Sequence, residues 1–213
     1  MSIFILLQEM SKLLPYRNPV DANLLDNFIK HNNIPIREEH RQLLINYGSS
    51  KDILNNGFSN LTFEKFQKHY LDNSLPFEDQ LPINTVYVGI DFADEYICID
   101  NDTGKIHLYY NRKKEKIYYD DLNSLVFICF IRSLYIDIFF EKIINNAKIN
   151  NPTKFFEKNA KYKIGEIQES ILYTIGNKLY IVSKHIYKMD CEFIIADIYE
   201  GGVMDNYVKI CSN

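Results

Sequence analysis

The spacing of apolar residues changes near residue 80, and this change limits the folds that the chain can adopt. Before it, residues 21–31 carry apolar side chains at helical spacing behind the N-cap residue Asp21. Pro35 precedes a second segment of this kind, residues 37–47. After residue 85 apolar residues recur at every second position, as they do in strands. Helices followed by strands predict an α+β fold.

The second half of this first domain reads as hairpins closed by a helix. Runs of strand-forming residues occupy 85–90, 95–100 and 105–110, with a shorter run at 116–119. The sequence from Asn101 to Gly104 is a turn signal, which predicts a hairpin. Asp120 or Asp121 then caps an apolar helix that we expect to run to about Asn145. These elements predict a mixed or antiparallel sheet with N-terminal helices and a C-terminal helix.

An Asn-rich segment from Asn145 to Pro152 marks the expected domain boundary. We predict a first domain at 1–148 and a β-rich extension at 149–213. In the extension, Thr153 can cap a short helix, and turns at Gly176-Asn177 and Gly201-Gly202 separate an antiparallel meander. Its strands are expected at 167–175, 178–188, 192–199 and 203–210. Because some 60 residues bury little core alone, we expect the extension to pack on the first domain.

Charge is unevenly distributed, although the net charge at pH 7 is only −4. No Lys or Arg occurs between Lys68 and Lys105, and a basic run follows. An acidic stretch repels nucleic acid and suits a basic protein surface, although a solvated loop face is the simpler alternative. The candidate partner-binding residues are Glu78, Asp79, Asp91, Asp94, Glu95, Asp100 and Asp102.

Cysteine usage and the apolar segments indicate a cytoplasmic protein. Cys98, Cys129, Cys191 and Cys211 are scattered, which predicts buried free thiols rather than disulfides or a zinc site. Glu9 interrupts the apolar N-terminal run too early for a signal peptide. The most apolar window, 125–140, contains Arg132 and is too short for a bilayer span, so we expect no membrane association.

None of the short motifs indicates catalysis, a cofactor or a metal. The triplet Asp102-Thr103-Gly104 matches an aspartic-protease signature but has no second copy, so we interpret it as a turn. The segment around Asp100 lacks the Gly and Glu positions of a calcium loop. We interpret His40 as a surface or edge residue, and His107 as a strand residue that can face solvent. We therefore predict no catalytic residues, no metal and no cofactor.

Two segments resemble the SUKH superfamily of cell-wall-assembly regulators and bacterial immunity proteins. The family pattern has an apolar residue and a proline, then a helix of the form x-x-[FHY]-x-x-L-L and a small turn. Here Ile34-Pro35 precedes a helix with His40, Leu43 and Leu44. The second signature, a strand pair with an acidic residue at each end of the first strand, is similar to 93–110. Ala93 stands where the family usually has glycine, and residues 151–213 have no counterpart in the pattern.

The resemblance implies a binding protein and carries over no catalytic residue. Members are widely found as antitoxins that bind secreted polymorphic toxins, many of them nucleases. It therefore implies a bacterial, cytoplasmic immunity protein that binds a cognate toxin domain and occludes its active site. A regulatory or scaffold module without a toxin partner is one alternative, and an uncharacterised enzyme is another. The sequence does not determine the toxin or the oligomeric state.

Overall fold

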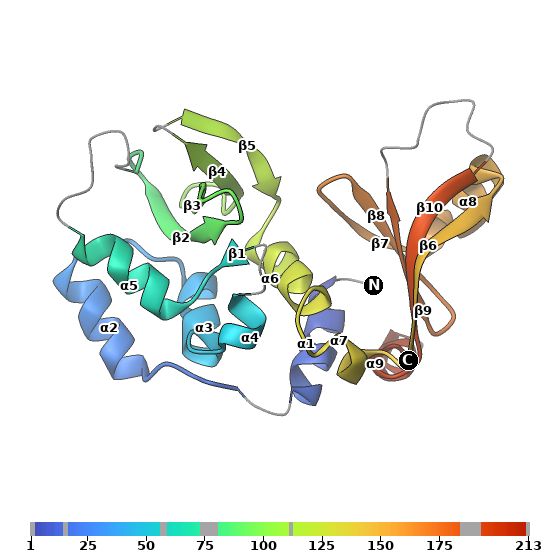
Figure 1. The fold of residues 1–213 in the computed structure, drawn as a ribbon, viewed down its shortest axis with the longest axis horizontal. Coiled ribbons are helices and arrows are strands. Elements are labelled where there is room, and N and C mark those ends of the chain that lie inside the picture. Colours follow the sequence, from blue (N-terminus) through green and yellow to red (C-terminus); the bar gives the residue numbers. More distant parts are fainter. Residues whose placement is uncertain are drawn as a thin grey trace. The chain divides into compact units, whose positions relative to one another are not determined.

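The computed structural model describes residues 3–14, 17–55, 59–72, 81–110, 113–183 and 193–211. Contacts between residues divide the chain into two compact units (Figure 1). The central unit spans residues 15–134, and the terminal unit joins residues 1–14 to residues 135–213. The division thus precedes the boundary expected after residue 148. Both units contain helices and antiparallel sheets, which confirms the α+β class.

In the central unit most helices precede the four longer strands, as the spacing of apolar residues predicts. Helix α2 begins after Asp21, whose side chain accepts a hydrogen bond from the backbone N–H of Leu24 at 2.9 Å. The elements in chain order are α2 (Ala22–His31), α3 (Glu38–Tyr47), α4 (Lys51–Leu54), β1 (Ser59–Asn60), α5 (Phe63–Leu71), β2 (Thr85–Asp91), β3 (Tyr96–Asp100), β4 (Ile106–Tyr110), β5 (Lys113–Tyr119) and α6 (Leu122–Ile131).

Its five strands form one antiparallel sheet in the order β1-β2-β3-β4-β5. In Figure 1, α2 to α5 gather on one side of this sheet. Strand β1 pairs with β2 only at Ile90 and Asp91. Further along β2, α5 packs against the strand, and the hydroxyl of Tyr70 accepts the N–H of Tyr87 at 3.1 Å. This contact satisfies a backbone donor on a strand edge that would otherwise be open to pairing.

The register assigns two different surfaces to this sheet, because paired residues of antiparallel strands share a face. One face carries buried aliphatic side chains, which are Val86, Ile97, Ile99, Ile106 and Leu108. The other carries a row of Tyr87, Cys98 and His107 and a neighbouring pair, Tyr96 and Tyr109. His107 is only 2% exposed, so it faces the interior rather than solvent.

Helix α6 is shorter than predicted. Asp121 caps it as expected, accepting the N–H of Ser124 at 2.7 Å. The helix ends at Ile131, and the segment expected to continue it to Asn145 forms a short helix and the start of a strand instead. The long-helix prediction is wrong because residues 142–150 pair with a later strand.

The terminal unit is built on a second antiparallel sheet, ordered β6-β10-β9-β8-β7. Four consecutive strands lie side by side, which confirms the predicted meander. Its elements are α1 (Ile3–Leu13), α7 (Ile136–Phe139), β6 (Lys142–Asn150), α8 (Pro152–Asn159), the 3-10 turn η2 (Ala160–Tyr162), β7 (Lys163–Ile167), β8 (Ser170–Ile175), β9 (Lys178–Ser183), β10 (Phe193–Glu200) and α9 (Val203–Cys211).

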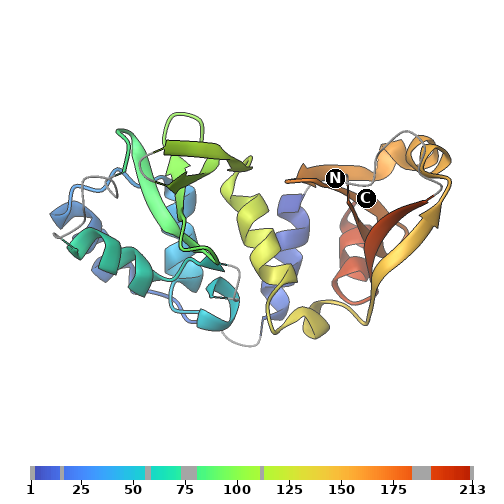
Figure 2. The same cartoon turned by 45° about the horizontal axis from the view of Figure 1, so that its top comes forward.

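Two predictions for the terminal unit are wrong in detail. The run 167–175 is one strand by composition, but a turn at Gln168, which has a φ of 50°, separates β7 from β8. Residues 203–210 form helix α9 rather than a strand. Figure 2 shows α9 beside α1, so the last helix of the chain packs on the first. The buried side chains of α9 are Val203, Met204 and Tyr207, which share one face at helical spacing.

Candidate functional site

The acidic stretch is divided by the fold between two ends of the central sheet. Strand β3 runs from Tyr96 to Asp100. The turn with Asp91, Asp94 and Glu95 precedes it, and the turn with Asp100 and Asp102 follows it. Five residues of strand separate the turns by about 17 Å. These carboxylates therefore do not form one continuous patch, and Glu78 and Asp79 lie outside the described residues.

Asp91 is a turn-forming residue rather than part of an accessible surface. It is 6% exposed, and its carboxylate accepts the N–H groups of Ala93 at 2.8 Å and Glu95 at 3.0 Å. Asp94 adopts a left-handed conformation with φ of 60°, which aspartate tolerates better than most residues. The result is a shaped turn that exposes Asp94 and leaves Phe92 73% exposed.

We expect Asp91→Ala to lower the free energy of unfolding by about 1–2 kcal/mol, because the N–H groups of Ala93 and Glu95 lose the buried carboxylate that accepts them. Urea denaturation measures this difference. Asp102→Ala is the matched control, because that side chain is exposed, and its change should stay within about 0.5 kcal/mol. Equal effects of the two substitutions would contradict a structural role for Asp91.

The turn between β3 and β4 is organised in the same way by Asp100. Its carboxylate accepts the N–H groups of Asp102 at 3.0 Å and Thr103 at 2.9 Å. Gly104 closes the turn with φ of 73°, a conformation that a side chain would strain. Asp102 is therefore the carboxylate that this turn presents to solvent.

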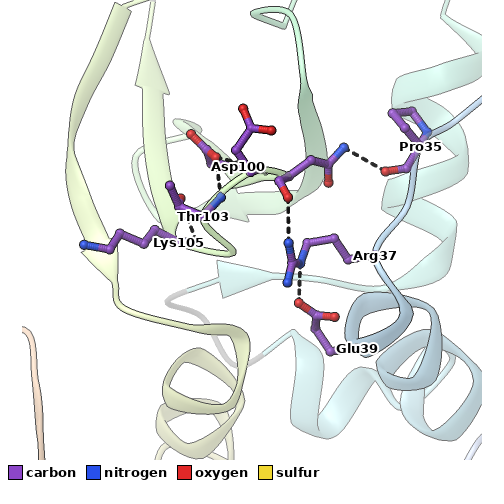
Figure 3. Close-up of polar contacts among 8 residues, drawn as sticks. Pro35, Arg37, Glu39, Asp100, Thr103 and Lys105 are labelled. Atoms are coloured by element: carbon purple, nitrogen blue, oxygen red, sulfur yellow. Dashed lines mark hydrogen bonds and ion pairs between the residues drawn. The ribbon is translucent and has the colours of Figure 1, made fainter.

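Arg37 holds this turn to the segment before α3 (Figure 3). Its Nη1 donates a hydrogen bond of 2.6 Å to the carbonyl of Asn101, and its Nε pairs with Glu39. The Asn101 amide in turn donates to the carbonyl of Pro35 at 2.8 Å. These two contacts join the hairpin to residues 64 and 66 positions earlier in the sequence, so they fix the Asp102 turn in place.

Arg37→Ala should speed amide hydrogen exchange at Asp102, Thr103 and Gly104 about tenfold, the effect of losing one hydrogen bond from a charged donor. Hydrogen-exchange mass spectrometry or NMR measures it. Arg41→Ala is the control, because the ion pairs that Arg41 makes among the described residues are with Asp26 on α2 and Glu38 on its own helix. Unchanged exchange in Arg37→Ala would show that the turn is held without the arginine.

The predicted basic run is divided between the two ends of the sheet. Lys105 follows the Asp102 turn, whereas Lys113 and Lys114 lie in β5 at the other end, and Arg112 lies outside the described residues. Tyr96 pairs with Tyr109, and Tyr109 and Tyr110 pair with Lys114 and Lys113. The first residues of β5 therefore lie at the end of the sheet where β3 begins. Near the Asp102 turn, Glu39 of α3 pairs with Arg37, a contact that the sequence did not suggest.

A second feature, which no short sequence motif indicates, is a histidine and tyrosine cluster where α5 meets β2. The imidazole of His69 stacks in parallel on Tyr87 with centroids 4.1 Å apart and meets Tyr96 edge-on at 5.2 Å. Burial lowers the pKa of His69 to about 4, so this ring is neutral at pH 7. Burial also raises the pKa of Tyr70, whose hydroxyl already accepts the Tyr87 N–H. The sequence indicates this cluster only through residues 86–109, where Tyr, Cys and His alternate with aliphatic residues.

Two hollows border His69. The larger, here the α5 cavity, has a volume of about 410 Å³. It is lined by the α2–α3 connection, the end of α5 and the start of β2, namely Asn32, Asn33, Ile34, Pro35, His69, Tyr70, Asp72, Leu81, Pro82 and Thr85. The smaller, here the lysine hollow, has about 100 Å³ and is lined by Lys65, Lys68, His69, Asp72, Tyr87 and Tyr96. A neutral imidazole, a carboxylate and aromatic rings suit ligand binding at the α5 cavity.

The remaining candidate groups are buried. Cys98 and Cys129 are buried free thiols, as predicted, whereas Cys211 is partly exposed and Cys191 lies outside the described residues. His40 is fully buried, so its interpretation as a surface or edge residue is wrong. Within the described part of the chain, no three His, Cys, Asp or Glu side chains are grouped to hold a metal ion. No helix there is long and apolar enough to cross a membrane.

Known proteins provide no further constraint on this site. Comparisons of the chain with protein-family models, curated proteins and solved structures found no match. The resemblance to the SUKH superfamily therefore stays a prediction.

Proposed function

We propose that this protein is an immunity protein that binds and neutralises a cognate secreted toxin domain in the bacterial cytoplasm. The observation that carries the proposal is the Asp102 turn, an exposed acidic hairpin end held in one conformation by Arg37 and Asn101. A fixed surface loses little conformational entropy on binding. Its negative charge complements a basic partner, such as the substrate-binding surface of a nuclease.

Binding by occlusion fits the shape of this surface. The hairpin end projects from a sheet whose two faces are buried, so a partner can meet it without rearranging the core. The exposed Phe92 at the opposite end supplies an aromatic side chain of a type that is enriched in protein interfaces. The same surface would serve a regulatory or scaffold module, which differs in its partner and not in its chemistry.

Growth rescue tests the proposal. The full chain is co-expressed with toxin domains encoded beside its gene, and each complex is then isolated through a tag on the toxin. We expect one toxin to be neutralised and to co-purify with this chain. Rescue without co-purification would indicate an effect other than binding, and absence of both for every neighbouring toxin would count against the immunity function.

A further inference from the structure

The α5 cavity gives little support to a charged ligand. Among the described residues that line it, only Asp72 carries a charge, and Asp72 already takes part in an interaction within the fold. Asp72 also lines the lysine hollow, so the ammonium groups of Lys65 and Lys68 oppose the entry of a cation. An anion is opposed by the C-terminal ends of α2 and α5, which carry partial negative charge. An uncharged ligand meets neither obstacle.

The other polar groups of the lining are uncharged and offer both donors and acceptors. The side-chain amide of Asn33 makes no hydrogen bond within the described part of the chain. The hydroxyl of Tyr70 accepts the N–H of Tyr87, which leaves its own proton to donate. One face of the His69 ring is stacked on Tyr87, so this residue contributes through its ring nitrogens. Because burial lowers the pKa of His69 to about 4, one nitrogen donates and the other accepts at pH 7.

Apolar side chains form the rest of the wall. Ile34 and Pro35 line the cavity from the α2–α3 connection, and Leu81 and Pro82 line it from the segment before β2. The Thr85 hydroxyl donates to the carbonyl of Pro82 at 2.6 Å, so it is already used within the fold. The volume of about 410 Å³ lies within the range of roughly 300–1,000 Å³ that is usual for ligand pockets. This lining suits a ligand with an apolar body and one polar group.

We infer that the α5 cavity binds a small uncharged molecule that has an apolar body and a carboxamide or lactam group. The polar group of the ligand pairs with Asn33, Tyr70 and His69, and its body lies against the apolar wall. The inference goes beyond the proposed function and does not depend on it, because the cavity shares no lining residue with the Asp102 turn among the residues described.

Benzamide, benzoate and benzamidine test the preference for an uncharged ligand, because they have nearly the same shape. At neutral pH benzamide is uncharged, benzoate is an anion and benzamidine is a cation. The full chain, labelled with ¹⁵N, is titrated with each probe. We expect saturable shifts at the amides of Asn33, Tyr70 and Thr85 with benzamide, and binding of the two ions that is about tenfold weaker or less. Equal or tighter binding of either ion, or no saturable benzamide shift at these amides, would overturn the inference.

A carboxamide can also come from a glutamine side chain of a protein partner. N-acetyl-glutamine amide carries that side chain without an aromatic body, and we expect it to bind about tenfold more weakly than benzamide, because it buries less apolar surface. Equal affinity of the two probes would overturn the assignment of this cavity to a small molecule.

Matched variants locate the polar contact. Asn33→Gly removes the side-chain amide, and glycine keeps the left-handed backbone there, where φ is 51°. The affinity for benzamide should fall roughly fivefold, the effect of losing one hydrogen bond. Asn84→Gly is the control, because Asn84 is also left-handed, with φ of 65°, but does not line the cavity. His69→Phe keeps an aromatic ring beside Tyr87 and should weaken benzamide by a similar factor. Wild-type affinity in both Asn33→Gly and His69→Phe would also overturn the inference.

Discussion

Replacing His40 with phenylalanine is expected to raise the free energy of unfolding by about 1 kcal/mol near neutral pH. His40 is fully buried, and neither ring nitrogen has a hydrogen-bond partner among the described residues. Its ring lies edge-on to Phe66 with centroids 5.3 Å apart, a geometry that phenylalanine also adopts. Phenylalanine removes two unsatisfied polar atoms and keeps the aromatic contact.

The effect should grow as the solution is acidified. Burial lowers the pKa of His40 from 6.5 to about 4, so the folded protein keeps this ring neutral over a range in which the unfolded chain binds a proton. The contribution of neutral His40 to the free energy of unfolding is therefore fully present above pH 6.5. It is lost progressively as the pH falls from 6.5 to about 4. Between the two ends of this pH range, the contribution of His40 to the free energy of unfolding changes by about 3 kcal/mol.

Urea denaturation of both proteins at about pH 7.5, 5.5 and 4 measures this effect. His40→Phe should lose less stability than wild type on acidification, and should keep the loss that His69 contributes in the same direction. His31→Asn is the control, because His31 is exposed. A less stable His40→Phe protein with the wild-type pH profile would mean that His40 has a partner in the folded state.

Asp102→Lys is expected to slow association with the neutralised toxin about tenfold at low ionic strength. Asp102 is the exposed carboxylate of the turn that Arg37 holds. Reversing the charge of this side chain changes the electrostatic potential of the turn but keeps the hydrogen bond from the backbone N–H of residue 102 to Asp100. Stopped-flow or surface-plasmon measurements at two salt concentrations give the association rate. The salt dependence should also weaken, because part of the attraction has been removed.

Two comparison variants separate this prediction from a general effect of charge. Glu157→Lys makes the same charge change on α8 and should leave the association rate within about twofold of wild type. Asp94→Asn removes the charge at the other end of the sheet, and asparagine tolerates the left-handed backbone there. A slower rate in Asp94→Asn than in Asp102→Lys would move the contact to the Phe92 end.

Local chemistry made several elements predictable from the sequence. Asp21 and Asp121 cap their helices by accepting a backbone N–H three residues later, which depends only on nearby residues. The hairpin turns at Asn101–Gly104 and Gly176-Asn177 need a left-handed glycine, and both glycines have positive φ. These interactions form between residues that are close in sequence, so short segments of the sequence are enough to predict them.

Other elements were decided by partners distant in sequence. Residues 142–150 follow an apolar helix but extend along β10, and Asn146, with φ of 56°, interrupts the pairing and bonds to Asp197. Residues 203–210 alternate well enough for a strand, yet they form a helix because their buried face packs on α1. In both cases tertiary packing outweighs a weak local preference.

The acidic residues show most clearly what the sequence determines and what the tertiary structure decides. The sequence alone determined that positive charge is absent between Lys68 and Lys105 and that turns interrupt this segment. Only the tertiary structure decided that Asp94 and Asp102 lie at opposite ends of β3, that Asp91 is buried, and that His69, Tyr87 and Tyr96 meet. Antiparallel pairing reverses the chain at each turn, so neighbours in sequence separate while residues from different strands and helices come together.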